Sequence, residues 1–294
     1  MHIPDLPPPA IPRLSHRHRA MLLEMGVPVW WPDPQVASTP PPVEAPVSQA
    51  PTARTETRSA LPPQRSVTPP PARVTSAPAR VQQTRPHDTA LDAWPHLEAL
   101  QAAIQACTRC GLAQGRQCAV PGMGDSQPDW LIVGEAPGEE EDRQGLPFVG
   151  RAGQLLDRML AAMQLTRTQK VYIANVLKCR PPMNRNPDPV EMAACSPYLL
   201  RQIQLLRPKM VLAMGRFAAQ TLLSEGGALS ADQARQLPLG KLRGRIHQVT
   251  LGGLALPVVV TYHPAYLLRS PAEKAKAWAD LCLAMDAMDN FHRH

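Results

Sequence analysis

Beyond about residue 90, the hydrophobic and polar residues follow a pattern that predicts short strands separated by helices. Continuous apolar runs of about five residues are typical of buried parallel strands. They occur at WLIVG (130–134), VYIANV (171–176), MVLAMG (210–215) and LPVVVTYH (256–263). Apolar residues at helical spacing instead predict helices within 91–107, 152–163 and 216–223. Strands that alternate with helices indicate an α/β fold.

Two further helices are predicted from the residues that would begin them. Asp188-Pro189-Val190-Glu191 combines an N-cap, a proline at the first helical position and a glutamate at the third, so a helix should run to about Leu206. Ser270-Pro271-Ala272-Glu273 has the same pattern and should open the last helix. We expect a three-layer α/β/α sandwich with a mostly parallel central sheet. Its active site should lie beyond the carboxyl ends of the strands.

Residues 36–90 have the composition of a disordered, Pro-rich linker. Of the 35 prolines in the chain, 20 lie in residues 1–90, and no Phe, Trp or Tyr occurs between Trp31 and Trp94. A stretch of this kind cannot bury enough apolar surface to offset the entropy lost on ordering. The compact domain is therefore expected in residues 91–294.

The charge is moderately positive, with 31 Lys and Arg against 24 Asp and Glu, or +7 overall. Residues 1–90 contribute +3 of this and the remainder +4. Such an excess fits a polyanionic partner. No apolar run approaches the roughly 20 residues of a membrane span, and the start of the chain has no signal-peptide pattern. These features predict a cytoplasmic protein with no membrane contact.

Six cysteines in a reducing compartment are expected to be metal ligands or core residues rather than disulfides. Cys107 and Cys110 form a C-x₂-C pair, and fifteen residues separate Cys179 from Cys195. Four thiolates would suit either zinc or a [4Fe–4S] cluster. Four cysteines buried in an ordinary core are the remaining alternative.

Four motifs at the predicted strand ends resemble those of the family 4 uracil-DNA glycosylases, the iron–sulfur class of the uracil glycosylase superfamily. The motifs are GEAPG (134–138), GLPFVGRAG (145–153), ANVLKCRPPMNRNP (174–187) and TYHPAYLLR (261–269). The resemblance covers about residues 97–290 and extends to residue identity, order and spacing. It implies a monomeric base excision repair enzyme that flips uracil out of single- or double-stranded DNA and hydrolyses its N-glycosidic bond.

The resemblance also implies which cofactor the cysteines would hold. The family binds a [4Fe–4S] cluster through two cysteine pairs at about this separation. The matching residues in this chain are Cys107, Cys110, Cys179 and Cys195. Cys118 and Cys282 match no ligand position, and Cys282 is expected to be a core residue of the last helix.

Two side chains match catalytic positions of the family. Glu135, with the backbone of Gly134 and Ala136, matches the loop that faces the sugar and the attacking water. There it would stabilise an oxocarbenium-like cation, position the water, or both. His263 matches the histidine beside uracil O2, which would donate a hydrogen bond to the developing uracil anion. Outside these motifs, we would interpret the glutamate as an exposed loop acid and the histidine as a core residue.

Three side chains match positions that recognise the base. Phe148 matches the aromatic residue that stacks on the flipped base, and Asn175 matches the amide that recognises the uracil edge. An amide can donate to O4 and accept from N3–H, which distinguishes uracil from cytosine. Glu141 matches the acid that sterically excludes the C5-methyl of thymine. The neighbouring acids are expected to form a solvated acidic turn at a helix start: Glu139, Glu140 and Asp142.

Residues 265–269 resemble the loop that enters the minor groove. Leu267 or Leu268 would wedge into the base stack, and Arg269 would hold a phosphate. RGRIHQ (243–248), which contains His247, resembles the loop of a related class that links covalently to DNA through a histidine. It lies too far along the chain for that role, which we do not assign to it.

Residues 1–35 contain a short apolar segment, within 13–31, that we interpret as a docking segment. Its sequence LLEMGVPVWWP (22–32) resembles the start of the psi subunit of the bacterial DNA polymerase III clamp loader. This resemblance implies a clamp-loader partner reached through the long linker. An alternative function follows from it, namely a glycosylase fold that docks on the replisome and has reduced or lost catalysis.

Overall fold

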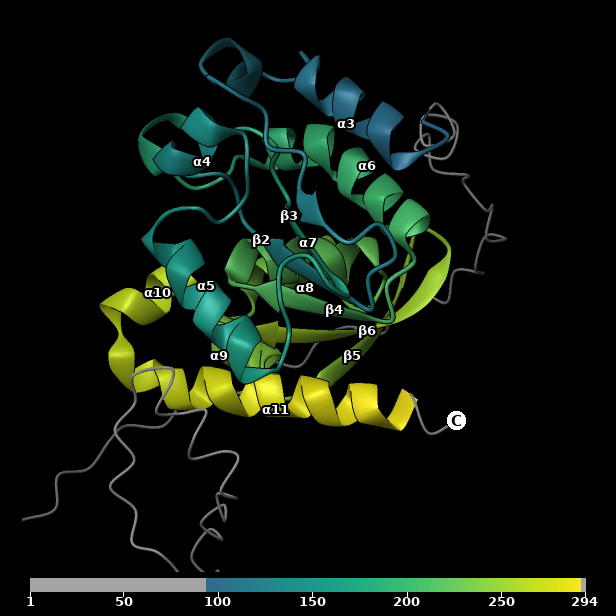
Figure 1. Cartoon of the computed structure of the whole chain (residues 1–294), viewed down its shortest axis with the longest axis vertical. Helices are drawn as coiled ribbons and strands as arrows, with labels where there is room; N and C mark the ends of the chain where they lie inside the picture. Colours follow the sequence, from purple (N-terminus) through teal and green to yellow (C-terminus); the bar gives the residue numbers. More distant parts are fainter. Residues whose placement is uncertain (1–93, 292–294) are drawn as a thin grey trace, which may run out of the picture. The chain divides into compact units, whose positions relative to one another are not determined.

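Six strands form one mixed sheet in the part of the chain that this computed structural model describes, residues 94–291 (Figure 1). They are β1 (Met123–Gly124), β2 (Trp130–Gly134), β3 (Val171–Asn175), β4 (Met210–Met214), β5 (Ile246–Leu251) and β6 (Leu254–Thr261). Their order across the sheet is β1-β3-β2-β4-β6-β5. The four inner strands are parallel, and each edge strand is antiparallel to its neighbour. The predicted α/β class and mostly parallel sheet are confirmed.

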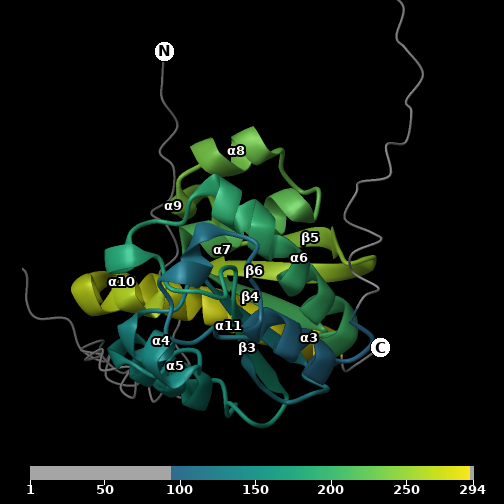
Figure 2. The same ribbon diagram turned by 90° about the horizontal axis from the view of Figure 1, so that it is seen from above.

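Helices cover both faces of this sheet (Figure 2). They are α3 (Leu97–Gln105), α4 (Glu139–Gln144), α5 (Arg151–Ala162), α6 (Pro189–Leu206), α7 (Arg216–Glu225), α8 (Ala231–Gln236), α9 (Leu239–Leu242), α10 (Pro264–Arg269) and α11 (Lys274–Phe291). Three 3₁₀ turns join them in the described residues: η1 (Gly111–Gln114), η2 (Pro182–Asn184) and η3 (Pro271–Glu273).

Alternate residues of β2 show why the sheet needs a helical layer on each face. Trp130 and Ile132 lie in a core that α5, α10 and α11 complete. Leu131 and Val133 point the other way, into a core completed by α6 and α7. All four side chains are at most 5% exposed, as expected of a parallel strand covered on both sides. The sandwich therefore has the three layers that the sequence predicts.

The two predicted helix starts differ in outcome. At α6, the Asp188 carboxylate accepts from the Val190 N–H at 2.8 Å, and Glu191 accepts from the Asp188 N–H at 2.9 Å. This capping box and the end at Leu206 are confirmed. The second prediction is wrong in detail, because Ser270 makes no side-chain cap and the short turn η3 precedes α11. Glu273 instead pairs with Lys276 at 2.9 Å.

The edge strand β5 was not among the predicted strands. It forms a hairpin with β6 across Gly252-Gly253, and both glycines have positive φ. Exposed and buried residues alternate along β5, as expected of an edge strand with one face packed on the core and the other exposed to solvent. The two-glycine turn between apolar stretches was the available signal, since such turns connect hairpin strands.

The proposed docking segment and linker, residues 1–35 and 36–90, lie outside the described residues. Of the described helices, none has the length and apolar character that crossing a membrane requires.

Candidate active site

The carboxyl ends of the four parallel strands carry the predicted site residues. Gly134, at the end of β2, pairs in register with Asn175 at the end of β3. His263 follows the end of β6 and begins α10. The helices α4 and α10 and the start of α5 gather at this end of the sheet (Figure 1). The expectation that the candidate site lies beyond the strand ends agrees with this arrangement.

Gly134, Phe148 and Asn175 meet in one tightly packed cluster. A Cβ on Gly134 would lie 2.3 Å from Asn175 Oδ1 and 2.6 Å from Phe148 Cζ. Only glycine at position 134 therefore lets these two side chains lie so close to the backbone. Phe148 is only 4% exposed, and its ring stacks on the His263 imidazole with centroids 5.4 Å apart. Residues from four separate motifs are thereby brought together.

Asn175 carries a buried acceptor that has no partner among residues 94–291. The residue is 2% exposed, and its Oδ1 is a buried oxygen without a hydrogen bond. Leaving a buried acceptor unpaired costs about 1–3 kcal/mol, so such atoms are uncommon unless a ligand or water completes them. The amide is therefore poised to accept a hydrogen bond from a bound molecule.

His263 is held in one tautomer by the start of α10. Its Nδ1 accepts from the Ala265 N–H at 3.1 Å, so the neutral ring carries its proton on Nε2. Burial lowers the pKa of His263 to about 4, helped by Arg269 and opposed by Glu141. The imidazole is thus neutral at pH 7 and offers an Nε2–H donor.

This burial of His263 predicts a loss of stability in mild acid. The pKa of an unfolded histidine is 6.5, so the unfolded chain takes up a proton before the folded one does. The stabilising contribution is complete above pH 6.5 and is lost as the pH falls towards 4. Between pH 7 and pH 5 it should amount to about 2 kcal/mol.

The melting temperature at pH 7 and at pH 5, measured for the parent and for His263→Asn, checks this expectation. Asparagine keeps an oxygen that can accept from the Ala265 N–H but does not titrate, so its variant should lose less stability on acidification. Equal losses in the two proteins would contradict the assignment.

Glu135 lies beside this cluster and is partly buried. Burial raises the pKa of its carboxyl group, and the positive charge of Arg216 opposes that rise. Arg216 is the first residue of α7, directly beyond the end of β4. A partly desolvated carboxylate at this place can stabilise a nearby cation or accept a proton from water.

Glu141 anchors the backbone on either side of Phe148. Its Oε1 accepts from the N–H groups of Val149 and Gly150 at 2.8 and 3.0 Å, and its Oε2 accepts from Gly138 at 3.0 Å. Three backbone donors thus fix this carboxylate. Whatever Glu141 does to a substrate, it also holds together the two loops that surround the cluster.

Arg167 holds the same loop from its other side, and sequence reasoning did not identify it. Its guanidinium donates to the carbonyl oxygens of Pro147 at 2.9 Å and of Phe148, and it pairs with Asp157. Phe148 has a positive φ of 54°, which few aromatic residues adopt. Anchors on both sides are what keep such a backbone in place.

Of the three acidic residues after β2 that were expected to be exposed to solvent, one is buried. Glu139 and Glu140 are exposed at the start of α4, as expected, and Glu140 pairs with Arg143. Asp142 is instead 3% exposed. Its Oδ1 accepts from the Gln117 N–H at 3.0 Å, so it anchors the segment that follows η1. The interpretation of Asp142 as a solvated acid is wrong.

The four paired cysteines share one small core between α3 and α6. That core contains Cys107, Cys110, Cys179 and Cys195. Cys118 is not part of it, and Cys282 packs in the core beneath α11, as expected. Within residues 94–291, no three His, Cys, Asp or Glu side chains converge closely enough to hold a single metal ion.

Positive groups and N–H donors surround these sulfur atoms. The Arg116 guanidinium donates to Cys179 Sγ at 3.1 Å, and the Lys178 N–H donates to Cys195 Sγ at 3.3 Å. Burial raises the pKa of the Cys195 thiol to about 12, and Lys178 opposes the shift. Donors of this kind stabilise metal-bound thiolates in a buried site.

The segment after His263 is a short helix, and its two leucines differ in burial. Leu267 is fully buried in the core beneath α5 and α11, whereas Leu268 is 39% exposed and Arg269 is exposed. A role for Leu267 as a DNA wedge is therefore wrong for this conformation, and Leu268 remains the candidate. His247 is the second residue of the edge strand β5, and its Nε2 hydrogen-bonds the Leu242 carbonyl oxygen at 2.7 Å.

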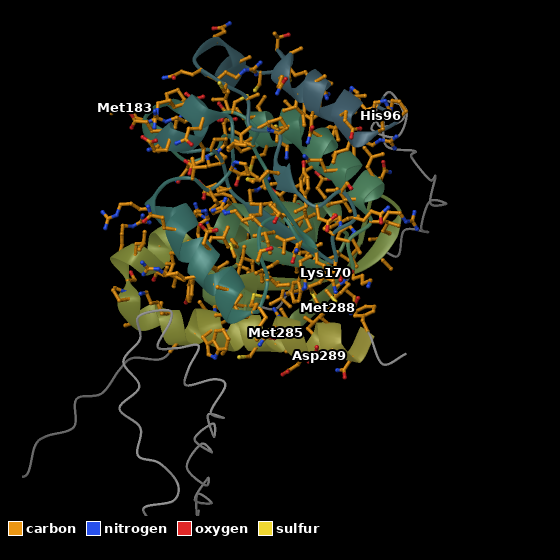
Figure 3. The ribbon with its side chains drawn as sticks, in the orientation of Figure 1. His96, Lys170, Met183, Met285, Met288 and Asp289 are labelled. Atoms are coloured by element: carbon orange, nitrogen blue, oxygen red, sulfur yellow. The ribbon has the colours of Figure 1, made fainter. Side chains whose placement is uncertain are left out.

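A second exposed apolar side chain lies in the turn between Cys179 and Cys195. Met183, labelled in Figure 3, is 95% exposed and has a positive φ of 52°. Arg180 and Arg185 flank it in the sequence, and Arg185 pairs with Glu191. The turn offers an apolar tip between two cationic side chains.

Comparisons with known proteins point to one family. The model of the uracil DNA glycosylase superfamily matches residues 121–282. The type-4 uracil-DNA glycosylase of Pyrobaculum aerophilum is 41% identical over 187 residues, which are 64% of this chain and 92% of that protein. The Archaeoglobus fulgidus enzyme of the same name is 40% identical, over 60% of this chain and 84% of its own. That of Thermotoga maritima is 39% identical, over 61% and 87%.

Proposed function

This chain belongs to the uracil-DNA glycosylase superfamily and within it to the type-4 enzymes, and from that membership we propose how its residues excise uracil. It is a DNA-repair glycosylase that hydrolyses the N-glycosidic bond of uracil in DNA. The alternative, a glycosylase fold that serves only for docking, finds no support. The chain keeps Glu135, Asn175 and His263 at the strand ends.

The unpaired Asn175 Oδ1 is the observation that carries the assignment of the base pocket. Uracil has a hydrogen on N3 that would satisfy this acceptor, and its O4 would accept from the Asn175 Nδ2. Cytosine has no hydrogen on N3 and carries an amino group at C4, so both contacts would fail. Release of uracil, thymine or cytosine from matched oligonucleotides tests this assignment.

Phe148 and His263 would complete the pocket around the flipped base. Phe148 supplies an aromatic face, already fixed by its loop, on which the base stacks. His263, neutral and protonated on Nε2, donates to uracil O2 as negative charge develops there. A neutral donor that is already oriented needs no rearrangement during the reaction.

Glu135 would act on the sugar side of the bond. The C1′–N1 bond breaks with its electron pair on uracil, and the sugar becomes cationic. A water molecule that Glu135 orients then forms the new bond to C1′ and gives its proton to the carboxylate. Burial raises the pKa of Glu135, which makes the carboxylate a better proton acceptor. Uracil leaves as the anion and is protonated by solvent.

For the cysteines, we propose a [4Fe–4S] cluster held by Cys107, Cys110, Cys179 and Cys195. The four thiols share one core, and Arg116 and the Lys178 N–H already donate to two of the sulfurs. The family resemblance favours iron–sulfur over zinc. When bound, such a cluster would supply cross-links between α3, α6 and the segment after β3, and it takes no part in the chemical step described above.

Replacement of Glu141 by glycine should admit some thymine but at a cost to uracil excision. The substitution opens space for a methyl group, yet it removes three hydrogen bonds that hold the Phe148 loop. At about 1 kcal/mol for each lost bond, uracil excision should fall roughly tenfold or more. Single-turnover release of uracil and thymine from matched oligonucleotides measures both effects.

Glu141→Gln is the matched control, because it keeps the size of the side chain. Its oxygen can still accept from Val149 and Gly150, but its amide would turn an N–H towards that of Gly138. Uracil excision should fall without any gain of thymine. If the glutamine variant excised thymine as well as the glycine variant does, exclusion would not be steric.

Towards DNA and other partners, we propose that Leu268 and Arg269 contact the duplex, the leucine as a wedge and the arginine on a phosphate. We further propose that the protein is a cytoplasmic monomer.

Residues 13–31, which lie outside the described residues, would dock on the clamp loader. A pull-down of clamp-loader subunits with residues 1–36 tests that last proposal.

A further inference from the structure

Lys178 is a buried lysine that contacts both the base-recognition residue and the cysteine core. It is 1% exposed. Its Nζ donates to the Asn175 carbonyl oxygen at 2.7 Å and to Gln202 Oε1 at 2.6 Å. Its backbone N–H donates to Cys195 Sγ at 3.3 Å. One residue thus joins the end of β3 to a proposed cluster ligand.

Gln202, on α6, extends this network to the segment that precedes β1. It is fully buried, accepts from Lys178 and donates through Nε2 to the Pro121 carbonyl oxygen at 2.6 Å. Burying an ammonium group is costly even when it is hydrogen-bonded, and a core of apolar side chains would avoid that cost. A lysine at this place therefore suggests a role beyond packing.

The contact with Asn175 lies at the end of β3, where a side chain rather than a neighbouring strand satisfies the backbone carbonyl. Asn175 is the last residue of β3, and on the β2 side its segment is held by the Val176 N–H, which donates to the Gly134 carbonyl at 3.0 Å. The Asn175 carbonyl itself is taken by Lys178 Nζ. The Asn175 Oδ1 has no hydrogen-bond partner in the described part of the chain, so its position depends on the Asn175 backbone and on packing against Gly134.

We propose that Lys178 is a positioning residue that fixes the Asn175 amide for uracil recognition and links its position to the cysteine core. This inference rests on the proposed role of Asn175 as the residue that recognises uracil. Lys178 touches no substrate atom and acts only through Asn175. The cysteine core would then affect uracil recognition through the Cys195–Lys178–Asn175 contacts rather than through chemistry.

A double-mutant cycle between Lys178→Met and Asn175→Ala tests the proposal. In the otherwise unchanged protein, Lys178→Met should lower kcat/KM for a uracil oligonucleotide roughly tenfold or more, since it leaves a buried carbonyl without its donor. In the Asn175→Ala background it should have little further effect. Equal losses in both backgrounds would show a general structural role and overturn the proposal.

Two measurements besides activity separate positioning from general damage. Affinity for a duplex with an abasic site should stay within about twofold in Lys178→Met, because that DNA has no base for Asn175 to recognise. Iron content should also match the parent. Weaker binding of abasic DNA, in parallel with the loss of excision, would count against the proposal. If Asn175→Ala itself leaves excision unchanged, the proposed function fails instead.

Two glutamines provide a gentler test should Lys178→Met fail to fold. Gln202→Leu removes one partner of Lys178, whereas Gln220→Leu is the matched control on α7. Gln220 is also buried and donates to a backbone carbonyl, that of Arg235. Gln202→Leu should lower kcat/KM roughly threefold, and less in the Asn175→Ala background. Equal effects of the two leucine substitutions would overturn the proposal.

Discussion

Asn175→Asp should lower the single-turnover rate of uracil excision roughly 10³-fold, because a site built to hydrogen-bond its substrate fails strongly when one partner is wrong. The side-chain amide lies buried between Gly134 and Phe148. A carboxylate there has no N–H to donate to uracil O4. It also places a charge in a pocket where water can solvate it only poorly.

Asn290→Asp makes the same chemical change on the exposed end of α11 and is the matched control. It should leave the rate within about twofold of the parent. The melting temperature of Asn175→Asp must also be measured, so that a folding defect is recognised. Excision by Asn175→Asp at the parental rate would show that another residue recognises the base.

Cys195→Ala should abolish the brown colour of the purified protein and remove most of its iron, which in the parent should be about four atoms per chain. Cys195 is 8% exposed and lies on α6, so its loss disconnects that helix from the other three thiols. We expect the melting temperature to fall by roughly 10 °C, equivalent to about 3 kcal/mol.

Cys118→Ala is the matched control, because Cys118 lies outside the cysteine core. It should keep both iron and stability. Metal analysis of the anaerobically purified proteins, together with their thermal unfolding, measures these effects. A parent with stoichiometric zinc and no iron would contradict the cluster assignment.

The central strands could be predicted from sequence because parallel strands buried on both faces are continuously apolar. This is true of β2 and β4, where every residue is buried. β5 could not be found by that rule, since one of its faces is exposed and its residues alternate. β1 has only two residues, Met123 and Gly124, and pairing with β3 alone makes it a strand.

The two leucines of α10 show how a wrong prediction of local structure leads to a wrong prediction of function. The segment was interpreted as a loop, in which either Leu267 or Leu268 could face DNA. It is a helix with His263 as N-cap and Pro264 at the first position, a pattern that favours helix starts. Consecutive helical residues differ by about 100° in direction, and in this helix Leu267 faces the core while Leu268 is 39% exposed.

The motifs predicted that Gly134, Phe148 and Asn175 lie close together, but not which residues hold them there. Gly134, Phe148 and Asn175 stand in stretches whose spacing is distinctive. Arg167 lies outside the motifs, and Lys178 lies within ANVLKCRPPMNRNP without a matched role. Most lysines and arginines lie on the surface, so neither stood out. Their roles depend on contacts with residues far along the chain, which only the folded chain reveals, such as that of Lys178 with Gln202, 24 positions away.

The most direct measurement is base release from three oligonucleotides that differ only in having uracil, thymine or cytosine at one position. With the iron-loaded protein, uracil should be released and should leave an abasic site. Thymine and cytosine should stay bound to their sugars, since we propose that Glu141 excludes the methyl group and that Asn175 rejects the cytosine edge. Release of cytosine at a rate similar to that of uracil, or no release of uracil by folded, iron-loaded protein, would contradict the account.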